Sequence, residues 1–298
     1  MLPSEHDQVE HTPDKSSVTC YIVQMMMDLR WLLFTAGLLA GCSAAPASPA
    51  AAVVSESGVT TSVAAEALDD APSYFVPWVG EAQALTNARA DMVARQIARR
   101  GVQNPNVLRA MATVPRHEFV SAEYLEQAYA DHPLSIGFGQ TISQPYIVAL
   151  MTELLALQGD EHVLEIGAGS AYQAAVLAQL LPQVYTIEIV PELAADAEAR
   201  LARLGIDNVQ VRADDGYFGW EAHAPYDAII VTAAPDQLPP PLVEQLAPGG
   251  RLVIPIGPQG GAQVLWQFVK EADGELTGYR ILDVRFVPFT RTTENAPK

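Results

Sequence analysis

Strand-like and helical patterns alternate four times between residues 161 and 257, and this alternation limits the fold more than any other feature. Short apolar runs such as HVLEI, QVYTIEI and YDAIIV are separated by helical stretches such as PELAADAEARLARLG. Strands that alternate with helices over short links predict a mostly parallel sheet with helices on its faces. We therefore expect an α/β fold with a doubly wound, Rossmann-like sheet.

Two flanking segments complete the predicted domain. Residues 84–158 show apolar side chains at helical spacing and no obvious strand, so we expect a helical section there. It ends in GQTISQPYIVALM, where Ser143 is a candidate helix cap and Pro145 suits the first helical position. After Gly260, two apolar runs predict antiparallel edge strands. The domain is thus expected over 84–298, as a helical section at 84–158 and an α/β section at 159–298.

The first 83 residues have a different character. A short apolar run after Met25 ends in Leu39-Ala40-Gly41-Cys42, and an Ala-, Ser- and Pro-rich stretch follows. The run is too short to span a bilayer but suits the apolar part of a secretory signal. The last four residues resemble a bacterial lipobox, which implies possible lipidation of Cys42. We expect residues 1–83 to be signal and flexible tether; the alternative is a chance apolar run in an Ala-rich chain.

The charge and the cysteines exclude several classes of function. The chain has 17 basic and 35 acidic residues, so its formal net charge is −18. This balance argues against a nucleic-acid partner, which needs a basic face, and an anionic substrate would need local donors. Both cysteines, Cys20 and Cys42, precede the predicted domain. A disulfide framework and a cysteine metal site are therefore excluded there, and we expect no metal.

Candidate binding residues follow the predicted strands, where ligands of such sheets bind. In EIGAGSAY, Gly167 and Gly169 allow a sharp turn and close approach of a ligand to the backbone. Tyr172 stands where a dinucleotide fingerprint would have its third glycine, which weakens that interpretation. The motif instead suits the nucleoside-binding loop of S-adenosylmethionine-dependent methyltransferases, and a plain tight turn is the alternative.

Three later strand ends add to this site. Glu188 lies about 20 residues after Gly167, where a carboxylate can accept both ribose hydroxyls; a solvent-facing side chain is the alternative. Asp214 and Asp215 end the third strand, where an acid can accept the adenine amino group, although paired acids are also common in turns. In VTAAPDQLPPP, small residues leave room above the sheet, and the prolines either form a pocket wall or merely introduce the next helix.

Eight segments resemble the protein-L-isoaspartate O-methyltransferase family, over about residues 84–292. They are RHEFV, GQTISQPYIVALM, VLEIGAGSAYQAAVLA, VYTIEIVPELA, NVQVRADDGYFGW, APYDAIIVTAA, LAPGGRLVIPIG and VRFVPFT. The resemblance implies an S-adenosylmethionine donor, isoaspartyl proteins and peptides as acceptors, and Ser143 as the active-site serine. It implies cofactor contacts at Thr141, Ile142, Gly167, Gly169, Ser170, Glu188, Asp215, Gly216 and Thr290.

The sequence departs from the family at two positions. The family usually has glycine at both Ala171 and Asp214. We expect Ala171 to be tolerated, because it is placed inside the helix start, where alanine is the better helix former. Asp214 adds a charge beside Asp215 and is expected to change cofactor affinity in a direction that the sequence does not give.

The family reaction methylates the free α-carboxylate of an isoaspartyl residue. This carboxylate is already ionised at neutral pH, so the reaction needs no general base. We expect Ser143 to position the acceptor through a hydrogen bond, with help from free amides at the following helix start. The methyl ester then closes to a succinimide, part of which reopens as aspartate, and this constitutes repair.

Two rival classes and the location remain open at this stage. A nicotinamide oxidoreductase on the same sheet is disfavoured by Tyr172. An exported, lipid-anchored binding protein that lost turnover is the other alternative. Because the donor is made in the cytosol, we expect a cytoplasmic enzyme, with membrane contact only if Cys42 is lipidated and a monomer as the default state.

Overall fold

The computed structural model describes residues 81–292, which hold most of the predicted domain. Residues 1–80 of the predicted signal and tether, including Cys42, lie outside this range. The last three residues assigned to the tether are not flexible: Glu81 forms a buried ion pair with Arg89, and α1 begins at Gln83. The first elements are helical, as expected: α1 (Gln83–Asp91), a π turn (Met92–Ile97), a 3₁₀ turn (Ala98–Arg100), α2 (Pro105–Thr113) and two 3₁₀ turns (Arg116–Phe119, Ala122–Gln127). Within 81–292, no helix is long and apolar enough to cross a bilayer.

One expectation for the helical section is wrong. Residues 84–158 contain two strands, β1 (Leu134–Gly137) and β2 (Gln140–Ile142), which pair as an antiparallel hairpin. Gly137, Phe138 and Gly139 all have positive φ at its tip. The hairpin leads directly into α3 (Pro145–Leu154), with Pro145 in the first turn as predicted. Residues 140–142 are therefore held by strand pairing, and Ser143 and Gln144 connect this strand to α3.

The α/β section forms the predicted sheet. Its strands are β3 (Val163–Ile166), β4 (Val184–Glu188), β5 (Val209–Ala213), β6 (Tyr226–Val231), β7 (Leu246–Ile256), β8 (Gln263–Lys270) and β9 (Leu276–Val284). The seven-stranded order is β5-β4-β3-β6-β7-β8-β9. Strands β3 to β7 run parallel, and β8 and β9 are antiparallel at the edge. The doubly wound sheet and the antiparallel edge are thus confirmed.

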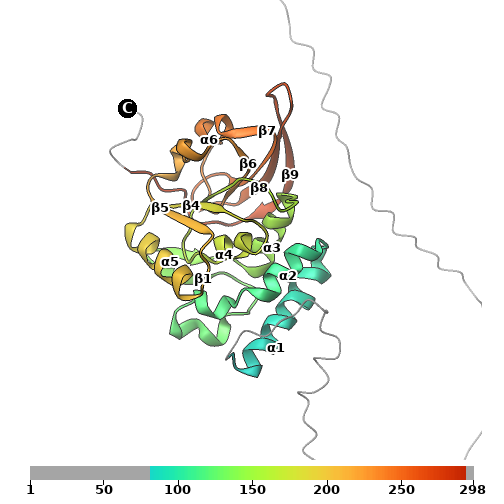
Figure 1. Ribbon diagram of the computed structural model, residues 1–298, viewed down its shortest axis with the longest axis vertical. Coiled ribbons are helices and arrows are strands. Elements are labelled where there is room, and N and C mark those ends of the chain that lie inside the picture. Colours follow the sequence, from blue (N-terminus) through green and yellow to red (C-terminus); the bar gives the residue numbers. More distant parts are fainter. Residues whose placement is uncertain (1–80, 293–298) are drawn as a thin grey trace, which may run out of the picture. The chain divides into compact units, whose positions relative to one another are not determined.

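Helices cover both faces of this sheet (Figure 1). Residues of α3 and α4 (Tyr172–Ala178) pack with Val163, Val184 and Ile230 on one face. On the other face, α6 (Pro240–Glu244) contributes Leu242 to a separate cluster. Because both faces are covered, the parallel strands read as apolar runs, which is why they were found from the sequence. The helix that follows VTAAPDQLPPP, α6, is short because β7 begins at Leu246.

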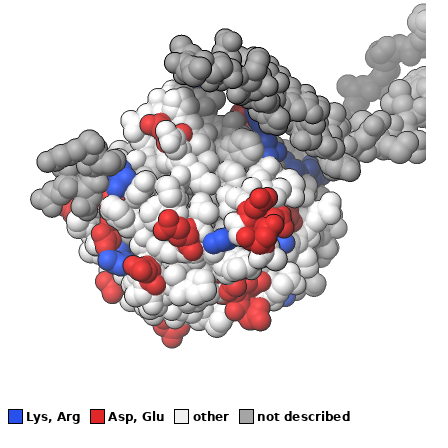
Figure 2. Space-filling view, turned by 90° about the horizontal axis from the view of Figure 1, so that it is seen from above, with Lys and Arg blue, Asp and Glu red and all other residues white. Residues whose placement is uncertain are grey.

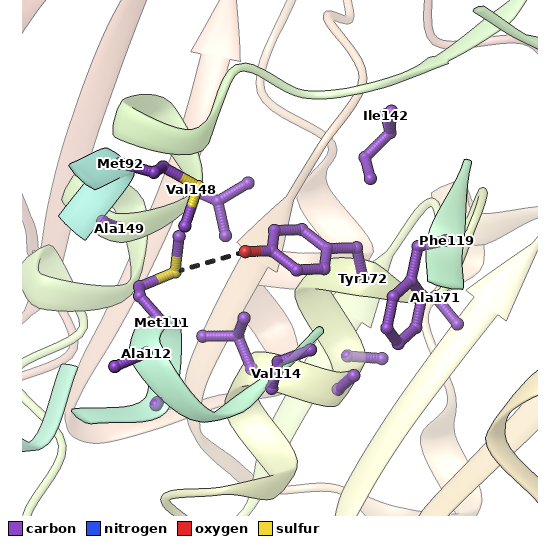
Figure 3. Packing of buried hydrophobic residues seen from close by; sticks show 14 of the residues in the cluster. Met92, Met111, Ala112, Val114, Phe119, Ile142, Val148, Ala149, Ala171 and Tyr172 are labelled. Carbon is purple, nitrogen blue, oxygen red and sulfur yellow. Dashed lines mark hydrogen bonds between the residues drawn. The ribbon is translucent and has the colours of Figure 1, made fainter. Parts of the chain in front are cut away.

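Tyr172 joins the helical section to the sheet layer. Its side chain is 1% exposed and belongs to a cluster that includes Met111 of α2, Phe119 and Val148 of α3. Figure 3 shows the ring lying between these elements, with its hydroxyl directed at the Met111 sulfur, 4.0 Å away. The residue that breaks the dinucleotide fingerprint therefore serves as a core side chain.

Candidate active site

A cavity opens where the strand order reverses, at the carboxyl ends of β3, β4 and β6. Strand β3 pairs with β4 on one side and with β6 on the other, so this is the switch point at which such sheets bind ligands. We call it the strand-end cavity. Its lining includes many of the predicted cofactor residues: Thr141, Gly167, Gly169, Glu188, Gly216 and Thr290.

The glycine loop after β3 is held close to the next strand ends. Gly167 has φ +98°, and a Cβ there would meet Oγ1 of Thr232 at 2.4 Å. The Thr232 hydroxyl donates to the carbonyls of Ile166, at 3.0 Å, and Gly167, at 2.7 Å. Gly216 is equally confined, because a Cβ there would lie 2.4 Å from Cγ2 of Ile166. Glycine is thus required by close approach at both positions.

Glu188 is a buried acid at the wall of this cavity. The residue is 4% exposed. Its Oε2 accepts from the Gly169 amide at 2.7 Å, and its Oε1 accepts from the Val190 amide at 3.0 Å. Each carboxylate oxygen has two lone pairs, so both retain acceptor capacity toward a ligand. The carboxylate therefore fixes the glycine loop and faces the space in which a ribose is predicted.

Asp215 is engaged by the C-terminal segment. Both of its oxygens accept from Nε of Arg291, at 3.1 and 2.9 Å, and Oδ2 also accepts from the Thr292 amide at 3.2 Å. The Arg291 guanidinium also stacks on Tyr217, 3.6 Å from the ring centre. Asp215 is 1% exposed and does not line the strand-end cavity, although its neighbour Gly216 does. Its predicted contact with adenine stays a prediction.

The two departures from the family pattern have clear local settings. We expected Ala171 to lie inside the helix start. It is instead the N-cap of α4, with φ +68°. This left-handed backbone favours glycine, so the argument from helix propensity was wrong in its premise. Asp214 pairs with Arg212 and accepts from the Asp215 amide at 2.8 Å. Its added charge is therefore balanced locally.

The acid of the glycine-loop motif does not reach the cavity. Glu165 of β3 is completely buried, and Oε2 accepts from the Thr186 hydroxyl on the neighbouring strand at 2.5 Å. Burial raises the pKa of Glu165 to about 8, and the nearby Glu188 carboxylate acts in the same direction. Burial therefore favours the protonated form of this side chain, which links β3 to β4.

Ser143 lies between two hollows. It lines a small cavity, here called the serine cavity, together with Thr141, Ile142, Gly169 and Ser170. It also lines a larger opening of about 620 Å³, here called the outer cleft. Thr141 lines the serine cavity, the outer cleft and the strand-end cavity. The predicted serine thus stands where the glycine-loop side of the site meets the outer surface.

Ser143 is not a helix cap, which corrects one expectation. The N-cap of α3 is Gln144, whose side chain instead donates to Asp131 Oδ1 at 2.8 Å. Within residues 81–292, no hydrogen bond engages the Ser143 hydroxyl, and neither hollow that it lines contains a His or Lys. Pro145 has no amide hydrogen, and the Ile147 amide already donates to the Gln144 carbonyl, so fewer free amides remain for an anion than expected.

The second wall of the strand-end cavity comes from the C-terminal segment. Val287, Pro288, Phe289 and Thr290 line it, together with Thr232 and Ala233 after β6. The Ala234 amide donates to Val287, and the Phe289 amide donates back to Ala234. The prolines of VTAAPDQLPPP do not line this cavity and instead introduce α6, so the alternative interpretation of that loop was the correct one.

Sequence reasoning missed two residues of this site. Thr232 was quoted only as a small residue, yet its hydroxyl secures the glycine loop. Arg291 was not singled out, although it follows the predicted Thr290 directly. Its pairing with Asp215 joins residues far apart in the chain, and no local pattern signals such a contact. Among residues 81–292, no cluster of three or more His, Cys, Asp or Glu side chains is arranged to hold a metal.

The chain is similar to a well-defined set of known proteins. The family model described as protein-L-isoaspartate(D-aspartate) O-methyltransferase matches residues 87–294. A protein-L-isoaspartate O-methyltransferase 2 from Polaromonas sp. is 57% identical over 184 residues, which are 62% of this chain and 87% of the relative. A protein-L-isoaspartate O-methyltransferase from Opitutus terrae is 52% identical over 209 residues, covering 70% and 89% of the two chains.

Solved structures give the same result. One protein-L-isoaspartate O-methyltransferase superposes with a TM-score of 0.62 and 33% identity, covering 67% of this chain and 65% of its own. A second, from Plasmodium falciparum, has a TM-score of 0.59 and 27% identity and covers 68% of this chain and 98% of its own. That second structure is a complex with S-adenosyl-L-homocysteine.

Proposed function

The chain belongs to the protein-L-isoaspartate(D-aspartate) O-methyltransferase family, and we propose that it methylates the free α-carboxylate of L-isoaspartyl residues in damaged proteins. One observation carries this proposal. Thr141 and Ser143, on one short segment, line both the cavity at the glycine loop and the open outer cleft. A donor held on the inner side and a peptide held on the outer side would therefore meet at these residues.

The residues at the switch point fit S-adenosylmethionine. Glu188 offers carboxylate lone pairs at the cavity wall, and Gly167 and Gly169 bring the backbone close to the space. When bound there, S-adenosylmethionine supplies an activated methyl group on a sulfonium. We assign the predicted contacts of Ile142, Ser170 and Thr290 on the basis that they line the strand-end or serine cavity.

The main task of the protein in this reaction is to place the acceptor carboxylate in line with the methyl group of the donor. An oxygen of the acceptor carboxylate bonds to the methyl carbon while the carbon–sulfur bond breaks and its electrons stay on sulfur. No proton moves, so no base is needed, which suits the lack of a His or Lys in the lining around Ser143. The Ser143 hydroxyl is proposed to donate to the acceptor carboxylate and hold it in line. Such alignment can be worth up to about 7–11 kcal/mol in well-oriented systems.

We propose that the enzyme works in the cytoplasm, where its donor is made. The lipobox-like segment at Cys42 supports an exported, membrane-anchored form as the competing proposal. In that case the exported copy would lack donor and would act as a binding protein without turnover.

The test is methyl transfer by the purified full-length chain. S-adenosylmethionine with a labelled methyl group is offered with an isoaspartyl peptide and with the matched aspartyl peptide. We expect base-labile methyl ester on the isoaspartyl peptide only. Equal labelling of both peptides, or of neither, would reject the proposed function.

A further inference from the structure

The outer cleft carries positive charge in a strongly acidic chain. Its lining contains Arg100 and Arg285 but only one carboxylate, that of Asp283, among the residues that the structure describes. The chain as a whole has a formal net charge of −18. On the face shown in Figure 2, acidic side chains form several separate groups, and basic side chains lie beside some of them. The two arginines that line this cleft with Ser143 therefore differ from the acidic character of the whole chain.

Arg100 is held in a fixed position. Its guanidinium lies over the ring of Tyr146, 3.6 Å from the ring centre, and Nη1 donates to Asp131 Oδ2 at 3.0 Å. Asp131 in turn accepts from Gln144, the residue after Ser143. Stacking on an aromatic ring and a carboxylate contact together order a long side chain. Asp131 partly balances the charge of Arg100.

Arg285 is the less compensated of the two cations. It follows β9 directly and is exposed. Between residues 81 and 292, no carboxylate lies within ion-pair distance of it; the nearby Asp283 instead accepts from Arg280 at 2.5 Å. An arginine without a partner at the wall of a cleft is available to a ligand anion.

Neither arginine is placed to bind the reacting carboxylate. Arg100 and Arg285 line the outer cleft but neither the strand-end cavity nor the serine cavity. A reacting carboxylate has to reach the inner side of Ser143, whereas the rest of the peptide remains in the outer cleft. The charges therefore face residues that neighbour the isoaspartyl residue.

We propose that Arg285, assisted by Arg100, selects isoaspartyl peptides that carry an acidic side chain next to the reacting residue. This inference rests on the proposed function, because it assigns the outer cleft to the peptide. Both arginines are solvent-accessible, so the preference is modest. Exposed ion pairs are worth about 0.2–1 kcal/mol, which corresponds to an up to about fivefold preference, and salt weakens it.

The test compares three isoaspartyl peptides that differ only at the residue beside the reacting one, which is Glu, Gln or Lys. The ratio of kcat/KM between peptides is measured for wild-type full-length protein, Arg285→Gln and Arg285→Glu, at low and high salt. Arg109→Gln is the matched control, because it removes an arginine that does not line the outer cleft. We expect a wild-type order of Glu, Gln, Lys, a flattened order in Arg285→Gln and a reversed order in Arg285→Glu. The control should keep the wild-type order.

The outcomes separate this inference from the function beneath it. If the wild-type chain methylates none of the three peptides, the proposed function fails. If it methylates all three equally, or if Arg285→Glu keeps the wild-type order, the function stands and the role of Arg285 is rejected. A preference for the Glu peptide that persists unchanged at high salt would also contradict an electrostatic origin.

Discussion

The backbone amide of Gly169 donates to Oε2 of Glu188 at 2.7 Å, and this bond ties the loop after β3 to the end of β4. A second amide, that of Val190, holds Oε1 at 3.0 Å. The carboxylate that is proposed to bind ribose is therefore already oriented by the protein. The same bonds make Glu188 a support of the glycine loop, so its loss should affect ligand affinity in two ways.

Replacing Glu188 with alanine should weaken S-adenosylhomocysteine binding by about 1.5–3 kcal/mol, the range for hydrogen bonds to a charged group. Titration calorimetry measures the change directly. Glu192→Ala is the matched control, because it removes an exposed glutamate from the first turn of α5 (Pro191–Arg203). Equal affinities in Glu188→Ala and the control would rule out the ribose role.

Ala171→Gly should leave the free energy of unfolding within about 1 kcal/mol of wild type. Glycine removes the strain of the left-handed backbone, which stabilises the folded protein by about 1–2 kcal/mol. This gain offsets two losses: the buried methyl group of alanine and the greater conformational freedom of glycine in the unfolded chain. Ala174→Gly, in α4 and fully buried, has no such strain to relieve and should cost roughly 2 kcal/mol. Urea denaturation of the two variants decides it, and equal losses would contradict strain at residue 171.

Glu165 should make the protein less stable as the pH rises. Its pKa in the folded protein is raised from 4.5 to about 8, chiefly by burial. Between these two values the unfolded chain releases the proton while the folded chain keeps it, so the free energy of unfolding falls with pH and levels off above about 8. In Glu165→Gln this contribution should disappear, and the variant should gain stability relative to wild type from pH 5 to pH 8.

Denaturation curves at pH 5, 6.5 and 8 measure this difference, with the exposed Glu192→Gln as control. A constant difference between Glu165→Gln and wild type across that range would show that residue 165 does not hold its proton on folding.

The location of the protein can be decided by fractionating cells that express the full-length chain and labelling them with a palmitate analogue. The cytoplasmic proposal predicts soluble, unlabelled protein. Recovery of the chain in the membrane, with label lost in Cys42→Ser, would establish the anchored form instead.

Much of the fold could be predicted from the sequence, because buried parallel strands are apolar runs bounded by glycine- or proline-containing turns. The glycine loop was found for the same reason, since Gly167 and Gly169 adopt conformations that glycine favours. The β1–β2 hairpin was missed, because its strands are short and mix Ser, Gly and Gln with apolar residues. Ala171 was misplaced because alanine carries no signal for a left-handed backbone.

The parts of the site that sequence reasoning could not supply depend on contacts between distant segments. Arg291 of the C-terminal segment contacts Asp215 after β5, and the Thr232 hydroxyl donates to the carbonyls of Ile166 and Gly167. The C-terminal segment, and not the prolines of VTAAPDQLPPP, forms the second wall of the strand-end cavity. Such long-range contacts depend on how the segments pack in three dimensions, and neither residue spacing nor composition predicts them.

The most direct measurement is the turnover and ligand affinity of Ser143→Ala beside wild type, with an isoaspartyl peptide as acceptor. If Ser143 positions the acceptor, kcat/KM should fall by about 10- to 100-fold, as expected for one lost hydrogen bond to a charged group. S-adenosylhomocysteine affinity should stay unchanged, and Ser143→Thr should keep part of the activity. Wild-type kcat/KM in the alanine variant, or a methyl group trapped on Ser143 of the wild-type enzyme, would contradict the account.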